Sequence, residues 1–459
     1  MEKYFQFLKR AFLFLLTACS IFSEFSCKPT YIFDGYDKEY GNDTTKWVNW
    51  NILFPPGTDD NTKNAEINRI SHYVSDYLRA NYPGITRARQ YYVACPCDPT
   101  LINYTATPLS GTTGSPVPPP LPKGGGGSGD KVAQNYTFYI DSAKDYNAKL
   151  DSNKKAVVGN SDVSDKTIGI MDTGLDPAYF PSIFPKYVWN DPTGKPVIAN
   201  YLFYINGNPL TNGFDDDDQK HGSAVTALSY EALETMNPGM HPKVMVMKVL
   251  DKNRKGNSFA SACALSYAFQ NKVTIVNASL GYYDDKAMDE ILQHYIDTAN
   301  AEKGKTPIIA AAGNTRGVHP KPICQPGEPL DTNRLRPGRL FFPACATPTS
   351  NNLISVTSLS SETNSCAYQN FSDLFVTVGV IANPGNNCCS FKVTWLDNTN
   401  YEGSSFATPI VTGKIMGCLL THPSSTTVRD CLDLFSPLPN PRPNTIFTIQ
   451  GRSFTYVSP

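Results

Sequence analysis

Three side chains in this sequence could together carry out nucleophilic catalysis. Asp172 follows a short apolar segment and is followed by Thr-Gly. His221 begins the sequence His-Gly-Ser-Ala-Val, and Ser405 lies in Gly-Ser-Ser-Phe-Ala-Thr-Pro. A serine hydroxyl becomes an effective nucleophile when a histidine accepts its proton and a carboxylate orients the imidazole ring. These residue types therefore indicate one site, provided that the fold brings them together.

Each motif also has an ordinary structural explanation. Asp172 is typical of a turn before glycine, His221 of a structural histidine, and Ser405 of a helix N-cap. Asp-Thr-Gly also occurs in the catalytic loop of aspartic proteases, whose chemistry requires two carboxylates. The chain has one Asp-Thr-Gly and no Asp-Ser-Gly, so that alternative would require a symmetric dimer.

The elements that must position these residues alternate between strands and helices. We expect strands at residues 167–171, 244–250, 273–278, 307–312 and 353–358, and helices at 221–233, 258–271, 284–303 and 404–422. This alternation is typical of the α/β class, with a doubly wound, mainly parallel sheet covered by helices on both faces. Ligands bind such sheets at the carboxyl ends of the strands, where Asp172 and Asn314 are expected.

The motifs and their order resemble those of the subtilisin-like serine proteases, the subtilases. The matching segments are residues 172–174, 221–225, 312–314 and 403–409. The chain order Asp, His, Ser is that of subtilisin and differs from those of chymotrypsin and the α/β-hydrolases. The resemblance covers roughly residues 160–435 and implies a serine endopeptidase that acts on protein or peptide substrates through an acyl-enzyme.

The resemblance also implies a role for each matching residue. Ser405 would be the nucleophile, His221 the base and then the acid, and Asp172 the group that holds the imidazole. Asn314 would form the oxyanion hole with the Ser405 N–H. The implied substrate-binding residues are Ser279, Leu280 and Gly281 at a strand edge, and Ala311, Ala312 and Gly313 in the first specificity pocket. The small side chains of the second group predict an open, apolar pocket.

The sequence departs from the family's usual pattern near two of the motifs. Lys220 and Ala224 stand where Gly and His are common, and Ser404 and Phe406 where Thr and Met are commoner. None of these replaces a catalytic residue, so we expect changes in cleft shape or rate only.

No cofactor is expected to be required. The acidic run at residues 215–218 is a candidate for a structural Ca²⁺, which the resemblance makes reasonable, but it is also typical of a solvated loop. We therefore assign no metal-ligating residues.

The composition limits the class of protein. The chain has 459 residues, 41% of them hydrophobic, which excludes a disordered or fibrous chain. Lys and Arg number 40 against 41 Asp and Glu, so the net charge supplies no field for nucleic acid. We expect a monomer that does not bind nucleic acid.

The N-terminal segment is typical of a protein that is exported. Two basic residues precede a short apolar run, and Leu16-Thr17-Ala18-Cys19 resembles the lipobox of bacterial lipoproteins. We expect residues 1–18 to be the signal peptide and Cys19 to carry a lipid that anchors the protein to a membrane of the cell envelope, on its periplasmic face or outer surface. An ordinary signal peptide remains the alternative.

The remaining sequence divides at a linker. We expect a small α+β N-terminal module at residues 19–104, a linker rich in Pro and Gly at 105–130, and the peptidase domain at 131–459. The module fits either a pro-domain that is cut away or a plain spacer. Two other functions stay open: a lipid-anchored pseudo-protease, and a peptide-binding or adhesion protein of the surface.

Export also makes the 12 cysteines candidates for disulfides. If Cys19 carries a lipid, an odd number remains, so at least one thiol is free or pairs between chains. We expect Cys263 and Cys418, which lie in apolar helical segments, to be buried free thiols.

Overall fold

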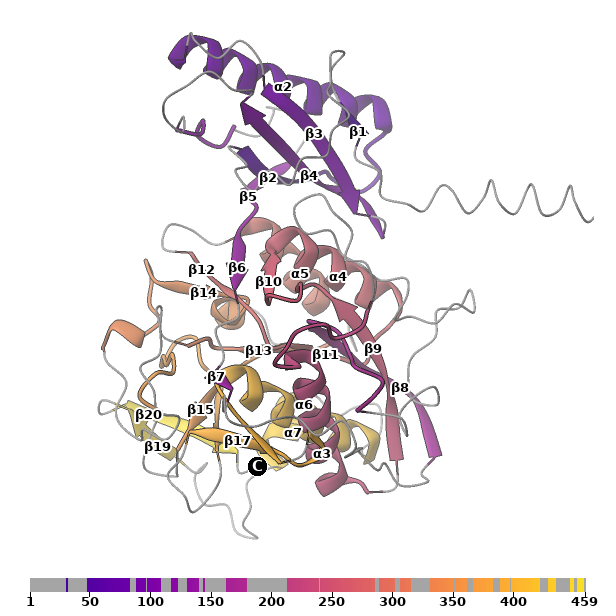
Figure 1. Cartoon of the computed structure of the whole chain (residues 1–459), viewed down its shortest axis with the longest axis vertical. Helices are drawn as coiled ribbons and strands as arrows, with labels where there is room; N and C mark the ends of the chain where they lie inside the picture. The colour runs from indigo at the N-terminus through magenta and orange to yellow at the C-terminus, as the bar shows by residue number, and fades with distance from the viewer. Residues whose placement is uncertain are drawn as a thin grey trace, which may run out of the picture. The chain divides into compact units, whose positions relative to one another are not determined.

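The chain forms two compact units, residues 1–132 and 133–459, in the computed structural model. The structure describes residues 30–31, 48–82, 88–95, 97–108, 117–122, 130–139, 143–144, 162–179, 213–238, 240–284, 289–301, 306–314, 331–349, 352–360, 366–382, 389–396, 398–421, 428–434, 446–449 and 452–457 (Figure 1). The expected signal peptide and Cys19 lie outside these residues. No helix in the described segments is both long enough and apolar enough to cross a membrane.

The N-terminal unit contains one helix and an antiparallel sheet. Its elements are β1 (Thr30–Tyr31), β2 (Val48–Leu53), α2 (Asp60–Asn81), β3 (Ala88–Cys95) and β4 (Asp98–Pro108), with β5 (Lys131–Gln134) beside β2 in the sheet order β1-β3-β4-β2-β5. The Asp59 carboxylate caps α2 by accepting from Thr62 N at 3.0 Å. Ile67, Ile70 and Val74 recur on one face of α2 and share a buried cluster with Trp50. The module therefore has a hydrophobic core of its own.

Part of the expected linker belongs to this module. β4 continues to Pro108, beyond the expected boundary at residue 104. Val117 N donates to the Tyr82 hydroxyl at 2.8 Å, and the Tyr73 hydroxyl donates to Pro120 O at 3.0 Å. Residues 117–122 thus lie along α2 rather than forming a free spacer.

The larger unit is an α/β structure built on an eight-stranded sheet. The strands are β8 (Asp162–Asp172), β9 (Met240–Lys248), β11 (Ile275–Ala278), β13 (Ile308–Ala311), β15 (Leu353–Leu359), β16 (Val378–Ile381), β19 (Ile446–Ile449) and β20 (Arg452–Val457), in the order β19-β20-β16-β15-β13-β11-β8-β9. Every pair is parallel except β19 with β20. The predicted fold class and its five expected strands are confirmed.

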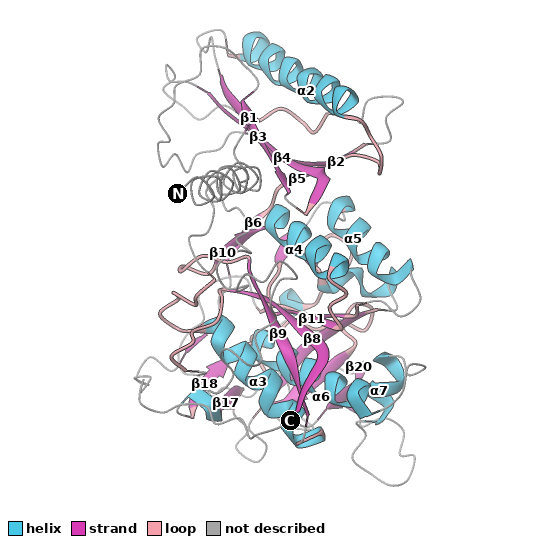
Figure 2. Cartoon of the chain, turned by 90° about the vertical axis from the view of Figure 1, so that its right-hand side faces the viewer, coloured by secondary structure: helices cyan, strands magenta, loops and turns pink. Residues whose placement is uncertain are grey.

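Helices cover both faces of this sheet. They are α3 (His221–Met236), α4 (Ser258–Gln270), α5 (Glu290–Ala301), α6 (Ser404–Thr421) and α7 (Val428–Leu434). In Figure 2, α4 and α5 lie on one side of the central strands and α3, α6 and α7 on the other. The expected helix at 284–303 is shorter, because Asp289 accepts from Ile291 N and Leu292 N and so caps the start of α5.

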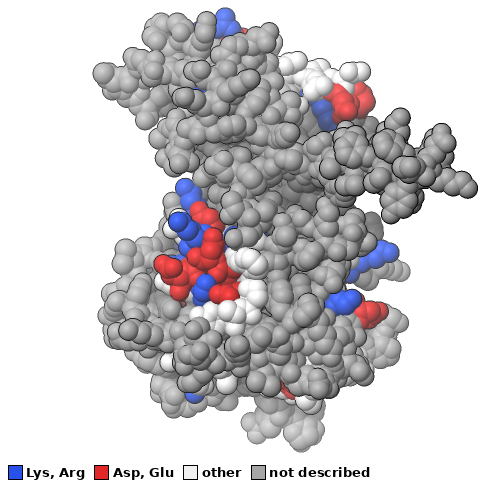
Figure 3. Space-filling view, turned by 45° about the vertical axis from the view of Figure 1, so that its right-hand side comes forward, with Lys and Arg blue, Asp and Glu red and all other residues white. Residues whose placement is uncertain are grey.

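Short elements complete the larger unit. These are β6 (Thr137–Tyr139), β7 (Ala143–Lys144), β10 (Lys255–Asn257), β12 (Tyr282–Asp284), β14 (Leu340–Phe342), β17 (Ser390–Val393), β18 (Thr399–Glu402) and 3₁₀ turns at Asp331–Asn333, Ala344–Thr349 and Thr394–Leu396. β12 pairs with β14, and β17 with β18. On the face drawn in Figure 3, acidic and basic side chains lie next to one another, as the near-zero net charge leads one to expect.

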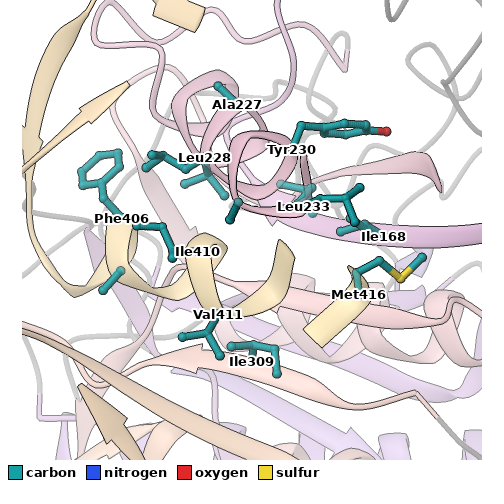
Figure 4. Close-up of a cluster of buried hydrophobic side chains, with 14 of the residues drawn as sticks. Ile168, Ala227, Leu228, Tyr230, Leu233, Ile309, Phe406, Ile410, Val411 and Met416 are labelled. Carbon is teal, nitrogen blue, oxygen red and sulfur yellow. The ribbon is translucent and has the colours of Figure 1, made fainter. Parts of the chain in front are cut away.

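The two helices α3 and α6 pack closely. A Cβ added to Gly413 would lie 2.0 Å from Ser229 O, so only glycine allows this approach. Apolar side chains of both helices surround the contact, and Val411 of α6 faces Ile309 of the sheet (Figure 4). The core of the larger unit is therefore centred on this helix pair.

Disulfides cross-link described segments of the larger unit. They join Cys366 to Cys389 and Cys418 to Cys431. The expectation that Cys418 is a free thiol is wrong, because α7 brings Cys431 against the end of α6. Cys263 is disulfide-bonded as well, contrary to expectation.

A half-buried carboxyl group on α3 should make stability depend on pH. Glu231 accepts from Trp395 N at 2.6 Å, and burial raises its pKa from 4.5 to about 7. Because the pKa of Glu231 is raised in the folded state, the protonated carboxyl group favours folding relative to the ionised one. This contribution to the free energy of unfolding is complete below the pKa of the unfolded state and is lost as the pH rises through about 7. Glu231→Gln keeps an acceptor oxygen and removes this titration.

We expect the free energy of unfolding of Glu231→Gln to rise relative to wild type by up to about 3 kcal/mol between about pH 4 and pH 8. Urea unfolding at a series of pH values measures this difference. The exposed Glu290→Gln is the control and should show no such trend. Parallel pH profiles of wild type and Glu231→Gln would contradict the prediction.

Candidate active site

Asp172 and His221 are in direct contact. Asp172 ends β8, and His221 is the first residue of α3. His221 Nδ1 lies 2.7 Å from Asp172 Oδ1, and both side chains are at most 1% exposed. A carboxylate can only accept, so Nδ1 carries a proton, and in the neutral ring the lone pair is then on Nε2. Among the described residues, this buried Nε2 atom has no hydrogen-bond partner.

The acidic run before α3 caps the helix that carries His221. Asp217 Oδ2 accepts from His221 N at 3.0 Å, Thr173 Oγ1 accepts from Gly222 N at 2.9 Å, and Asp215 Oδ2 accepts from Ser223 N at 2.8 Å. The first three N–H groups of α3 therefore each have a side-chain acceptor, which helix starts require. Negative charge at this end also suits the helix dipole.

Asp215 links the Asp172 loop to α3. Its Oδ1 accepts from Thr173 Oγ1 at 2.8 Å, and its Oδ2 accepts from Ser223 Oγ at 2.7 Å as well as from Ser223 N. Complete burial raises the pKa of Asp215 to about 6, although these donors act in the opposite direction. The Ser223 hydroxyl thus stabilises a carboxylate that fixes both motifs.

Lys248 supplies the positive charge beneath this loop. Its buried ammonium group donates to Thr173 O at 2.6 Å and Phe214 O at 2.7 Å, and it pairs with Asp216. The carboxylate oxygens of Asp215 and Asp217 already serve protein donors. The acidic run therefore fits a helix cap better than a calcium site, and we derive no role for calcium.

Asn314 and Ser405 lie at a second strand-to-helix junction. Asn314 follows β13, and its Oδ1 accepts from Ser404 N at 3.1 Å and from Ser404 Oγ at 3.3 Å. A Cβ added to Gly403 would lie 3.1 Å from Asn314 Nδ2, so the amide nitrogen lies beside the turn that precedes Ser405. Gly403 has φ +132°, which favours glycine in this turn.

The packing of α3 on α6 brings the two junctions together. The His221 ring lies 4.9 Å from the ring of Phe406, measured between centroids. Phe406 follows Ser405 directly and also packs against Tyr401 at 4.7 Å. The structure thus places His221 against the residue next to Ser405.

The side chain of Ser279 is hydrogen-bonded to the backbone of Ser405. Ser279 is fully buried, and its Oγ donates to Ser405 O at 2.7 Å. Asn277 Nδ2 donates to Ser279 Oγ at 2.8 Å, and Thr412 Oγ1 donates to Asn277 Oδ1 at 2.9 Å. These two supporting residues were not identified from the sequence, where neither stands in a recognisable motif.

Pro409 explains why the Ser405 carbonyl is free for this bond. In an α-helix the N–H of residue 409 would donate to the carbonyl of residue 405, but proline has no N–H. The proline four residues after Ser405 is therefore the one feature of the sequence that could have predicted a donor from outside the helix.

The other expected substrate-binding residues are also buried. Leu280, Ala311 and Ala312 are at most 3% exposed. Both Gly281 and Gly313 contact the ring of Phe341. The small side chains of residues 311–313 predict an open pocket, and nothing in their sequence indicates that the Phe341 ring lies against them.

Comparison with known proteins gives one family match. Residues 164–431, more than half of the chain, match the model of the subtilase family (Peptidase S8). No curated protein matches the sequence. The chain is similar to the crystal structure of a lanthipeptide protease, at 18% identity and TM-score 0.42, over 64% of this chain and 85% of that one. It is also similar to a cold adapted subtilisin-like serine proteinase, at 16% identity and TM-score 0.40, over 70% and 93%.

Replacing Asp215, which links the Asp172 loop to α3, should destabilise the protein. Asp215→Asn replaces an acceptor oxygen with an NH₂ group that faces existing donors, so we expect a loss of stability on the order of 2 kcal/mol. The exposed Asp218→Asn, in the same run, should cost little. Denaturant unfolding of both variants checks this, and equal stability of the two would contradict the assignment.

Proposed function

Because the chain belongs to the subtilase family, we propose that it is a serine endopeptidase in which Ser405 is the nucleophile and His221 the general base. The observation that carries this proposal is the buried hydrogen bond from His221 Nδ1 to Asp172 Oδ1, 2.7 Å long. It holds the imidazole in the tautomer whose Nε2 can accept a proton, and that atom has no partner among the described residues.

In the proposed reaction, Nε2 of His221 accepts the proton of the Ser405 hydroxyl as the oxygen attacks the peptide carbonyl. Asp172 stabilises the imidazolium that forms and keeps its ring oriented. The imidazolium then donates its proton to the leaving amine, which leaves an acyl-enzyme on Ser405. Water hydrolyses the acyl-enzyme with His221 again acting as base and then acid.

The negative charge on the tetrahedral intermediate would lie between Asn314 and the start of α6. Asn314 Oδ1 is held by Ser404, which leaves Nδ2 as the side-chain donor. The N–H groups at the start of α6 and the positive end of its dipole stabilise the same charge. Because the surrounding side chains are buried, these interactions act in a low dielectric.

Two candidate functions without turnover are a pseudo-protease and a surface peptide-binding protein. Neither requires a histidine whose Nδ1 is bonded to a buried carboxylate while Nε2 has no partner in the described part of the chain. Such an arrangement costs stability, which catalysis explains and binding alone does not.

A fluorophosphonate probe tests the proposal, because it reacts with an activated serine. We expect the purified protein to be labelled, Ser405→Ala to remain unlabelled, and Asp172→Asn to be labelled far more slowly. If wild type is silent, an engineered protease site at residues 123–129 would allow the N-terminal module to be cut from the larger unit. Labelling after that cut would identify an inhibitory pro-domain, and continued silence would refute the proposed activity.

The oxyanion donor can be tested separately from the backbone that it supports. Asn314→Asp keeps an oxygen to accept from Ser404 N but removes the Nδ2 donor. We expect kcat to fall by on the order of 10²–10³ with little change in KM, the range that loss of one such donor costs in subtilisin itself. Steady-state kinetics on a peptide substrate measures both constants. An unchanged kcat would exclude Asn314 from the oxyanion hole.

A further inference from the structure

The ring of Phe341 lies between the two chain segments that flank Ser405. The segment after β11 is joined to Ser405 through the 2.7 Å bond from Ser279 Oγ to Ser405 O. The segment after β13 is joined to the same turn through Asn314 and Ser404. Each segment contains a glycine, Gly281 and Gly313.

One edge of the Phe341 ring contacts both glycines. A Cβ added to Gly281 would lie 2.4 Å from Phe341 Cε1 and 2.6 Å from Cζ. A Cβ added to Gly313 would lie 2.7 Å from the same Cζ and 2.8 Å from the same Cε1. The ring therefore fills the gap between the segments so closely that neither could carry a side chain there.

The ring is held in this position. Phe341 on β14 pairs with Tyr283 on β12, and the two rings meet edge to face with centroids 5.0 Å apart. The Tyr283 hydroxyl lies 2.6 Å from Asn314 O and 2.8 Å from Asn370 Oδ1, and its single proton is shared between these two acceptors. Phe341 N donates to Cys345 Sγ at 3.1 Å, and the side chain is only 8% exposed. Moving the ring would disturb this packing.

The position of Phe341 matters because of where a substrate side chain must go. The carbonyl that Ser405 attacks would place its oxygen beside Asn314. The Cα on the acyl side is bonded to that carbonyl carbon, and we place its side chain in the gap between residues 279–281 and 311–313, the two segments expected from the sequence to bind substrate. Between these segments it meets the edge of the Phe341 ring.

We propose that Phe341 restricts the substrate residue on the acyl side of the scissile bond to glycine or alanine. This inference rests on the proposed endopeptidase function. A hydrogen or a methyl group fits against a ring edge, whereas a leucine or phenylalanine side chain requires the ring to move. Substrates of this class are peptides with small residues at the cleavage site.

The test uses phosphonate probes and peptide substrates on the full chain. Fluorophosphonate, which lacks an amino-acid side chain, reports whether Ser405 is activated. Peptidyl diphenyl phosphonates ending in the analogue of alanine or of phenylalanine report the size of the pocket. We expect the alanine probe to label wild type about tenfold faster or more than the phenylalanine probe, and tetrapeptide substrates to give the same order of kcat/KM.

Replacing the ring should reverse this preference in steps. The measured quantity is the labelling rate with the phenylalanine probe divided by that with the alanine probe. We expect this ratio to rise in Phe341→Leu and to rise further, by about tenfold or more over wild type, in Phe341→Ala. The preference at the next substrate residue should not change. Phe375→Ala removes a ring of similar burial, 7% exposed, from the segment between β15 and β16 and should leave the preference unaltered.

The outcomes separate this inference from the proposed function. Labelling of wild type by the phenylalanine probe as fast as by the alanine probe would overturn the role of Phe341, even if the alanine variant fails to fold. Ser405-dependent labelling with an unchanged preference in Phe341→Leu and Phe341→Ala would overturn it too. No Ser405-dependent labelling by any probe, before or after the linker is cut, would refute the activity and the inference with it.

Discussion

The geometry of the candidate active site depends on how closely α3 approaches α6. His221 begins one helix and Ser405 lies in the first turn of the other, so the distance between the helices sets where the imidazole lies relative to the hydroxyl. Gly413 permits backbone contact with Ser229, where any side chain would separate the pair. This close approach of the two helices brings the ring of His221 into contact with that of Phe406.

The polar interactions around the site serve the same purpose as this packing. Asp215, Asp217 and Thr173 each accept one N–H from the start of α3. Lys248 joins the carbonyl of Thr173 to that of Phe214 beneath them. A charged loop in water would move freely, whereas these groups are buried and bonded to one another. The start of α3 is thus held both by its packing against α6 and by these polar interactions.

The sequence predicts those parts of the site that depend on local pattern. Asp172, His221 and Ser405 stand at ends of strands or helices whose apolar runs are visible, so the alternation of elements and the α/β class follow from the residues. Contacts between distant segments are different. Nothing near Gly281 or Gly313 indicates that Phe341 lies against them, and the disulfide of Cys418 depends on where α7 turns back. Such contacts depend on register and side-chain packing, which no short motif encodes.

Pro409 has a mechanical consequence for the backbone at Ser405. The first turn of a helix is usually its least stable part, because it frays before the interior does. Since Pro409 has no N–H to donate to the Ser405 carbonyl, that carbonyl accepts from the Ser279 hydroxyl beyond the end of β11. The backbone of Ser405 is therefore bonded to the segment that follows β11 of the central sheet, so fraying of the first turn of α6 is opposed at Ser405.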